Sequence, residues 1–129
     1  MQTNCYRVFL LFIFLLITNT IFAQAPAVSP VAGSGAAGFS GDGGPATSAE
    51  LNSPSEVAVD AKGNVFIADL NNNRIRKVNS SDVINTFAGN GATGYWYLEG
   101  GPAISSVLNH PFGTAVDFNG NVFIGDFGG

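Results

Sequence analysis

The aspartates are the first residues to consider for chemistry, because clustered carboxylates bind calcium or act as general acids and bases. Six aspartates occur, and no two of them lie within two residues of each other. A calcium loop needs carboxylates at alternate positions along the chain. We therefore expect Asp60, Asp69, Asp117 and Asp126 to cap turns. Asp42, within a glycine-rich stretch, is somewhat more open to an ion.

The histidine, the cysteine and the glycine motif indicate no catalytic or cofactor site. His110 is the only histidine, and the only cysteine, Cys5, lies in an apolar N-terminal segment. A zinc site needs three or four ligands, so this chain would need ligands from elsewhere to complete one. Gly33-x-Gly35-x-x-Gly38 fits the dinucleotide fingerprint, but the glycine-rich sequence after it cannot form the helix that the fingerprint requires. We expect no catalytic residue, no metal ligand and no cofactor.

Two features remain as candidate sites. Tyr95, Trp96 and Tyr97 are consecutive, and aromatic side chains on a loop can stack on sugar rings or anchor a protein partner. Alternatively, the three aromatics cover the loop and pack on neighbouring strands. Asn79-Ser80-Ser81 is an N-glycosylation sequon on an expected hairpin tip, usable in a eukaryotic source. We predict a ligand-contact loop at the aromatic triplet and an acceptor for N-glycosylation at Asn79.

The N-terminus has the three parts of a secretory signal peptide. Arg7 precedes the unbroken apolar run Val8–Ile17, and Ala23-Gln24-Ala25 supplies the small residues of a cleavage site. A membrane anchor is the alternative, but this run is about half of the ~20 apolar residues that span a bilayer. We expect a signal peptide over 1–23, a lead-in linker over 24–30, and a secreted or extracellular protein (periplasmic or cell-surface in a bacterium) with no membrane insertion after cleavage. The net charge of −4 does not favour nucleic acid or anionic lipid as a partner.

The remaining chain is built from two copies of one repeat. Gly43–Ala46 recurs as Gly100–Ala103, and Gly63–Ile67 recurs as Gly120–Ile124, both with an offset of 57 residues. A fixed period of this kind is typical of repeat architectures. We assign 31–86 to the first repeat and 87–129 to a second, truncated one.

Each copy is predicted to form short strands separated by polar turns. The first copy predicts strands over 57–60, 65–68, 74–78 and 83–88, and the second of these is apolar throughout, as expected for a strand covered on both faces. The glycine-rich stretch 33–54 is expected to be a loop at the rim, with Thr47–Glu50 as a capping box for one helical turn that the second copy has lost. Four hairpin-connected strands at a fixed period predict an all-β fold of four-stranded antiparallel β-propeller blades.

The two copies resemble the NHL-repeat β-propellers. The resemblance rests on Asn52-x-Pro54, Val57–Asp60, Gly63–Asp69 and Asn72–Val78, and Gly41–Ala46 resembles the inter-blade loop of long bacterial-type members. It covers 31–129, with Glu56 as a departure from a usual glycine that Gly113 keeps. The resemblance implies a propeller of about six blades, of which this chain supplies about one complete and one partial blade.

The function that we expect is that of a secreted, non-enzymatic binding or scaffold module. Its partner would be a protein or a glycan, and the sequence contains no nucleophile–base pair or ligand cluster. Because some NHL-type propellers are zinc lyases, a fragment of a metal-dependent lyase or lactonase is an alternative. A fragment of a receptor or adhesion ectodomain is another.

Overall fold

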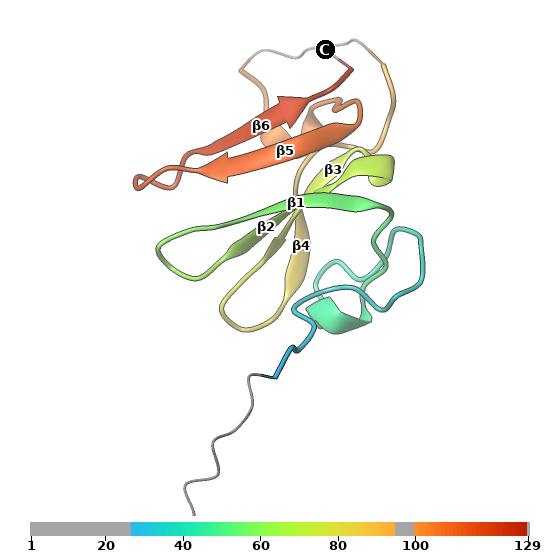
Figure 1. Ribbon diagram of the computed structural model, residues 1–129. Helices are drawn as coiled ribbons and strands as arrows, with labels where there is room; N and C mark the ends of the chain where they lie inside the picture. The colour runs from blue at the N-terminus through green and yellow to red at the C-terminus, as the bar shows by residue number, and fades with distance from the viewer. Residues whose placement is uncertain (1–26, 95–99, 129) are drawn as a thin grey trace, which may run out of the picture.

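The computed structural model describes residues 27–94 and 100–128, which form two antiparallel sheets (Figure 1). The strand order is β1-β2-β3-β4 in the first sheet and β5-β6 in the second. The strands are β1 (Pro54–Val59), β2 (Val65–Asp69), β3 (Arg74–Val78), β4 (Ile84–Ala88), β5 (Pro111–Val116) and β6 (Val122–Asp126), and three short 3-10 helices join them, η1 (Ala46–Ser48), η2 (Leu70–Asn72) and η3 (Ala103–Ser105). The predicted all-β fold of antiparallel propeller blades is confirmed. No helix in the described part of the chain is long and apolar enough to span a membrane.

The strand boundaries follow the apolar pattern closely. β3 has the predicted bounds, while β1 begins three residues earlier than predicted, at Pro54. A bulge between Pro54 and Val57 lets the strand start at a proline, since a proline at the first position of an edge strand needs no ladder hydrogen bond.

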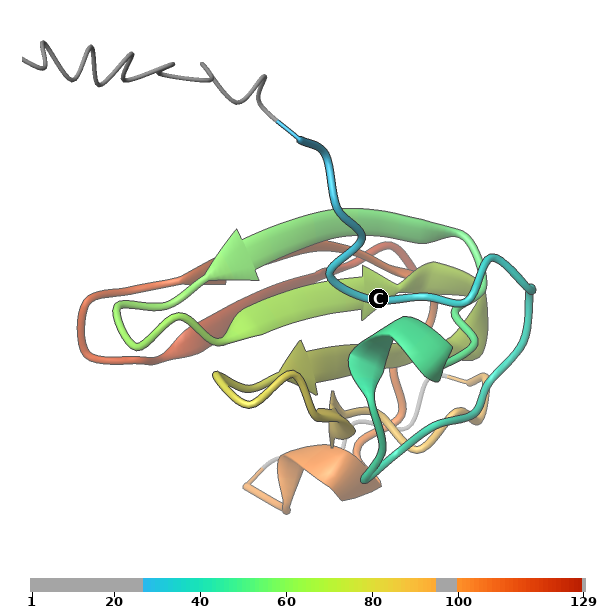
Figure 2. The ribbon, with the colours of Figure 1, turned by 90° about the horizontal axis from the view of Figure 1, so that it is seen from below.

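The first sheet buries one apolar cluster on each face, as the continuous apolar run in β2 predicted. We call the face that carries Ile67, Val78 and Ile84 the front face, and the opposite face, which carries Phe66 and Ile75, the rear face. Ala46 and Ala49 of the preceding loop cover the front face. The rear face is covered by the second repeat, with β5 lying across β1 and β2 (Figures 1 and 2).

The glycine-rich stretch that was predicted as a rim loop is mostly exposed, but it contributes two buried alanines to the core. Its backbone forms one bridge within the stretch, from Ala37 to Leu51, and one from Pro45 to Val83, the residue before β4. Ala46 and Ala49 pack on the front face. The predicted capping box is wrong, because the turn is a 3-10 helix that begins after Pro45 and has no side-chain cap. The second copy forms the equivalent helix η3, also without a cap. The proline and the packing of the alanines, not a polar cap, specify this turn.

Candidate functional site

The most buried charges in the first blade hold the structure together. Arg76 is fully buried, and its guanidinium donates to Asp42 Oδ1 at 2.7 Å and lies 3.4 Å from Asp69 Oδ2. It also donates to the backbone oxygens of Ser40 at 3.0 Å and Glu50 at 3.3 Å. One side chain from β3 thus ties the covering loop to the front face of the sheet.

Asp42, the aspartate predicted as the most open to an ion, is a partner of this guanidinium. Burial of its carboxyl would raise the pKa of Asp42, but the hydrogen bond from Thr86 and the charge and hydrogen bond of Arg76 outweigh it and hold that pKa below its usual range. The Thr86 hydroxyl donates to Oδ2 at 2.7 Å, so both carboxylate oxygens accept a hydrogen bond. Among the described residues, no group of three or more histidine, cysteine or acidic side chains could hold a metal ion.

Asp60 and Asp117 cap hairpin turns, as predicted. The Asp60 carboxylate accepts the N–H groups of Lys62 at 2.9 Å and Asn64 at 2.8 Å, and also the side-chain amide of Asn64 at 2.6 Å. Asp117 repeats this arrangement 57 residues later with its own turn amides. The side-chain hydrogen bond from Asn64 is the main cause that lowers the pKa of Asp60. Both carboxylates are therefore ionised turn acceptors.

Asp69 and Asp126 were also predicted as turn caps, and for their main contacts that prediction is wrong. The Asp69 carboxylate accepts the N–H of Asn52 at 2.7 Å, and Asp126 accepts the N–H of Asn109 at 2.8 Å. Each bond joins the end of a blade's second strand to the segment that leads into its first strand. Asp69 does bond within its own turn as well, to the Asn72 amide at 2.8 Å. The spacing of 17 residues recurs in both repeats and is the sequence signal that identifies this pair.

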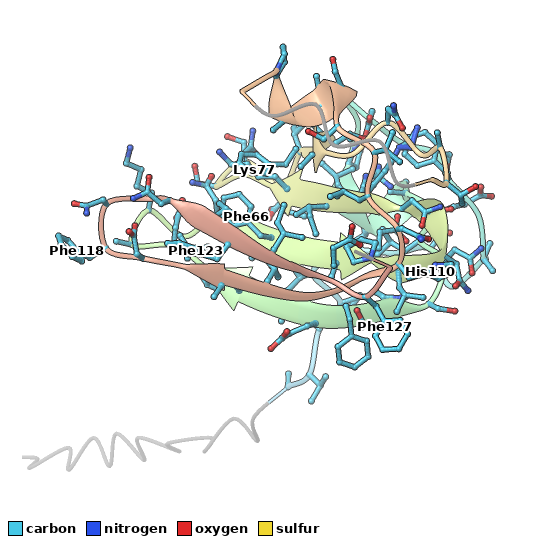
Figure 3. All side chains as sticks on the ribbon, turned by 90° about the horizontal axis from the view of Figure 1, so that it is seen from above. Phe66, Lys77, His110, Phe118, Phe123 and Phe127 are labelled. Carbon is cyan, nitrogen blue, oxygen red and sulfur yellow. The ribbon has the colours of Figure 1, made fainter. Side chains whose placement is uncertain are left out.

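The strongest candidate for a binding site is an apolar hollow at one end of the sheets. It has a volume of about 430 Å³ and is lined by Leu70, His110, Phe112 and Phe127, which we call the aromatic corner. Phe112 is 59% exposed and Phe127 is 86% exposed. His110 and Phe127 lie at the opposite end of the sheets from Phe118, which projects from the turn between β5 and β6 (Figure 3).

A comparison of the two repeats shows that the blade does not need these aromatics. Residues 57 positions before His110, Phe112 and Phe127 are Ser53, Ser55 and Leu70. The backbone is the same at the first pair, since Ser53 and His110 both adopt a positive φ, of 53° and 57°. The first repeat thus builds the same local structure with two serines and a leucine. Contiguous exposed apolar surface is a common feature of interaction sites, and for this reason we treat the aromatic corner as a candidate.

The backbone of His110 has a structural role in addition to the position of its ring at the hollow. Its backbone N–H donates to Asn73 Oδ1 at 2.9 Å, which joins the two repeats, and its ring Nδ1 lies 3.0 Å from Asn109 Oδ1. The ring is exposed, so it adds a polar group to the rim of the otherwise apolar hollow.

A second hollow, of about 310 Å³, lies at the other end, between the β1–β2 and β5–β6 turns. Lys62, Lys77 and Phe118 line it together with the rear-face side chain Phe66, and the Lys77 ammonium lies 5.6 Å from the Phe66 ring centroid (Figure 3). Phe66 is a core residue and the two aspartates beside it are turn caps. Fewer side chains of this second hollow are free of a structural role than in the aromatic corner, so we consider it a weaker candidate for a binding site.

Of the two sites predicted from the sequence, the structure describes the surroundings of one. Tyr95, Trp96 and Tyr97 lie outside the described residues. Asn79 lies at the turn between β3 and β4, as expected, with exposed Ser80 and Ser81 beside it. Its Oδ1 accepts the N–H of Ser81 at 2.9 Å. Glycosylation at Asn79 stays a prediction.

Comparison with known proteins connects these blades to a family. A family model of the teneurin NHL domain matches residues 31–95. Teneurin-4 of Homo sapiens is 58% identical over 38 residues, which are 30% of this chain and 1% of that protein. Teneurin-1 of Mus musculus is 46% identical over 43 residues, which are 33% of this chain and 2% of that protein. The chain therefore matches only a very small part of these relatives' length.

Solved structures show the same blade architecture. An auxiliary nutrient binding protein from Bacteroides thetaiotaomicron is similar with a TM-score of 0.60 and 27% identity, covering 74% of this chain and 25% of that one. A protein of unknown function from the same bacterium has a TM-score of 0.57 at 23% identity, covering 64% of this chain and 20% of that one, and this likeness concerns the fold alone. With the family match over half of its length, the chain belongs to the teneurin-type NHL-repeat domains of the β-propeller fold.

Proposed function

We propose that this chain is part of an extracellular, non-enzymatic binding module, in which an NHL-type propeller binds a protein or carbohydrate ligand at the aromatic corner. The observation that carries the proposal is the exposure of Phe112 and Phe127 at positions where the first repeat has Ser55 and Leu70. Burial of the Phe112 and Phe127 rings against a ligand would contribute favourable free energy.

The corner suits a ligand with an apolar face and a few polar groups. The faces of Phe112 and Phe127 can stack on a sugar ring or an aliphatic side chain, and the His110 ring can donate or accept one hydrogen bond at the rim. A hollow of about 430 Å³ is within the size range of small-ligand pockets. The hollow is apolar enough for burial of its surface to contribute to the free energy of binding, and it is open enough to accept part of a larger partner.

The comparisons support a general ligand-binding role, without indicating which ligand is bound. One structural neighbour is described as a nutrient binding protein, which agrees with a propeller that binds ligands. The teneurin relatives extend far beyond the matched segment. The ligand of this chain is therefore proposed from its own surface.

A non-enzymatic role is supported by how the described titratable groups are used. Asp42, Asp60 and Asp117 have lowered pKa values because they accept structural hydrogen bonds, whereas a carboxyl that donates a proton near neutral pH needs a raised pKa. Arg76 and Asp69 are buried within the blade. The signal-peptide pattern of the N-terminus supports an extracellular location, and the N-terminal mass of the secreted chain would test it.

The experiment is a binding screen of the full chain on glycan and peptide arrays. A Phe112→Ala/Phe127→Ala double variant should lose at least about tenfold in affinity for any ligand found, since central aromatic contacts are commonly worth more than 1 kcal/mol each. Phe118→Ala is the matched control, because Phe118 is 91% exposed but lies at the other end of the sheets. Absence of binding on both arrays, or equal binding by the double variant and the wild type, would contradict the proposal.

A further inference from the structure

Two asparagine–glycine pairs occur in the sequence, Asn90-Gly91 and Asn119-Gly120. In such a pair the backbone nitrogen of the glycine can attack the asparagine side-chain amide, because glycine has no side chain to hinder the approach and adopts many backbone conformations. The reaction also requires that the asparagine side chain be free to rotate toward that nitrogen. The two pairs differ in this respect, since the structure holds one asparagine in place and leaves the other free.

Asn90 is held at both ends of its side-chain amide. Its Oδ1 accepts the N–H of Ala92 at 2.8 Å, and its Nδ2 donates to the backbone oxygen of Ser105 at 3.3 Å. The Arg74 guanidinium donates to the backbone oxygen of Asn90 at 2.9 Å and also covers Gly91, where an added Cβ would collide with it. Rotation of the Asn90 amide toward the Gly91 nitrogen would therefore break two side-chain hydrogen bonds beneath an arginine.

Asn119 lies at the exposed tip of the turn between β5 and β6, the turn that carries Phe118 (Figure 3). Its backbone N–H donates to Asp117 Oδ1 at 2.9 Å, but its side-chain amide makes no hydrogen bond with any residue in 27–94 or 100–128. One hydrogen bond restrains the attacking nitrogen, because the Gly120 N–H donates to the backbone oxygen of Asp117 at 3.0 Å. The space around Gly120 is open, since an added Cβ would meet no atom within 4 Å.

The exposure of this tip is a property of the turn itself. Lys62-Gly63 occupies the equivalent position in the first repeat, 57 residues earlier, and Gly63 donates the same backbone hydrogen bond to Asp60 at 3.0 Å. The second repeat packs against that first blade, and Lys62 and Gly63 are exposed nonetheless. A neighbouring blade therefore leaves the tip of this turn accessible to water.

We propose that Asn119 is a site of deamidation in the folded protein and that the fold protects Asn90 from the same reaction. The Gly120 nitrogen loses its proton to the solvent and attacks Asn119 Cγ. A carbon–nitrogen bond forms, the bond to the side-chain nitrogen breaks, and that nitrogen leaves as ammonia. Water then opens the resulting cyclic imide. Cleavage at Cγ gives aspartate, and cleavage at the main-chain carbonyl carbon gives isoaspartate, whose backbone runs through the former side chain.

Either product places a new carboxylate at the second hollow. Asn119 lines that hollow together with Lys62 and Lys77. Conversion of a neutral amide into a carboxylate there lowers the positive charge that the hollow offers to an anionic ligand, and isoaspartate also lengthens the backbone of the turn. This modification does not depend on the ligand site proposed above.

Peptide mapping by mass spectrometry, after incubation of the full chain at neutral pH, tests the proposal. Glu99 lies between the two asparagines, so a protease that cleaves after glutamate places them in separate peptides. The urea-unfolded chain supplies the reference rate for each site. Each hydrogen bond that must break lowers the rate about fivefold. Asn119 should therefore react no more than about fivefold more slowly in the folded chain than in the unfolded one, and Asn90 at least about thirtyfold more slowly.

Asn119→Gln is the matched control, because a longer side chain must close a larger and less favourable ring. Its peptide should stay unmodified, whereas the wild-type peptide should yield aspartate and isoaspartate forms that elute separately. Circular dichroism before and after incubation would establish that each chain stays folded. Equal protection of the two asparagines, faster reaction at Asn90 than at Asn119 in the folded chain, or an equally modified Asn119→Gln peptide would overturn the proposal.

Discussion

Replacing Arg76 with methionine is the substitution whose effect on the fold can be worked out most directly. Methionine keeps most of the buried volume of the arginine stem but removes the guanidinium, which contacts Asp42, Asp69 and two backbone oxygens of the covering loop. Removing one partner of a buried ion pair costs about 3–5 kcal/mol, because the other charge stays buried. Asp69 is fully buried and is that charge.

The lower end of this range applies here. Without Arg76, the Asp69 carboxylate still accepts the N–H of Asn52 at 2.7 Å and the side-chain amide of Asn72 at 2.8 Å. Asp42 is partly exposed and can be solvated by water. We therefore expect Arg76→Met to lower the free energy of unfolding by about 3 kcal/mol, with the loop 38–50 losing its attachment to β3.

Urea denaturation at one low protein concentration, followed by circular dichroism, would measure this loss. Lys62→Met is the control, since an exposed lysine on a turn should change stability by no more than about 0.5 kcal/mol. Asp69→Asn should cost less in the Arg76→Met background than in the wild type, because the asparagine removes the uncompensated charge. A loss below about 1 kcal/mol for Arg76→Met would refute the view that this ion pair fastens the loop to the sheet.

Three further predictions concern other parts of the molecule. The pKa of Asp42 is lowered in the folded chain, so the contribution of its carboxylate to stability is present above about pH 4 and is lost as the pH falls through the folded pKa. Asp42→Asn should therefore flatten the fall of the urea midpoint between about pH 5 and pH 3. An unchanged slope would contradict this prediction. Gly113→Ala should be less favourable in the wild type than in a Glu56→Ala background by about 1 kcal/mol. Its Cβ would lie 3.0 Å from Glu56 Oε2, so that the carboxylate, which accepts the Thr114 N–H, must shift by a few tenths of an ångström. A double-mutant cycle measures the difference, and additivity would disprove the contact. Trp96 is the only tryptophan, so its fluorescence should change when an array-identified ligand saturates the chain, whereas constant emission would argue against the aromatic loop as part of the site.

The repeat, the strands and the two-sided burial of β2 could all be predicted from the sequence. Apolar runs and turn residues act over a few positions, and a second copy at a fixed offset repeats the same information. The turn-capping roles of Asp60 and Asp117 were predictable for the same reason, because their partners lie two and four residues ahead.

Long-range contacts were the part that local patterns missed. Asp69 was predicted to cap its own turn, but its shortest hydrogen bond goes to an amide 17 residues earlier. Glu56 was noted only as a departure from a usual glycine, and the structure explains it through the space above Gly113 in the next blade. Both depend on which segments the sheets bring together, and a single residue pattern does not contain that information.

The residues of the aromatic corner could have been found by comparing the two repeats position by position. Phe112 and Phe127 stand where the first repeat has Ser55 and Leu70, and only the fold shows that these two positions lie beside the same hollow. Single hydrophobic residues on a surface are common, so neither substitution was informative alone. The clustering in space makes them a candidate site.

Hydroxyl-radical footprinting of the full chain, with and without a ligand from the arrays, tests the binding role of this corner most directly. Oxidation of Phe112 and Phe127 should fall several-fold when the ligand is bound, because both rings are exposed in the free chain. Phe118, which is 91% exposed at the other end of the sheets, should be oxidised at the same rate in both samples. Unchanged oxidation at the aromatic corner, with protection at Phe118 instead, would contradict the proposed site.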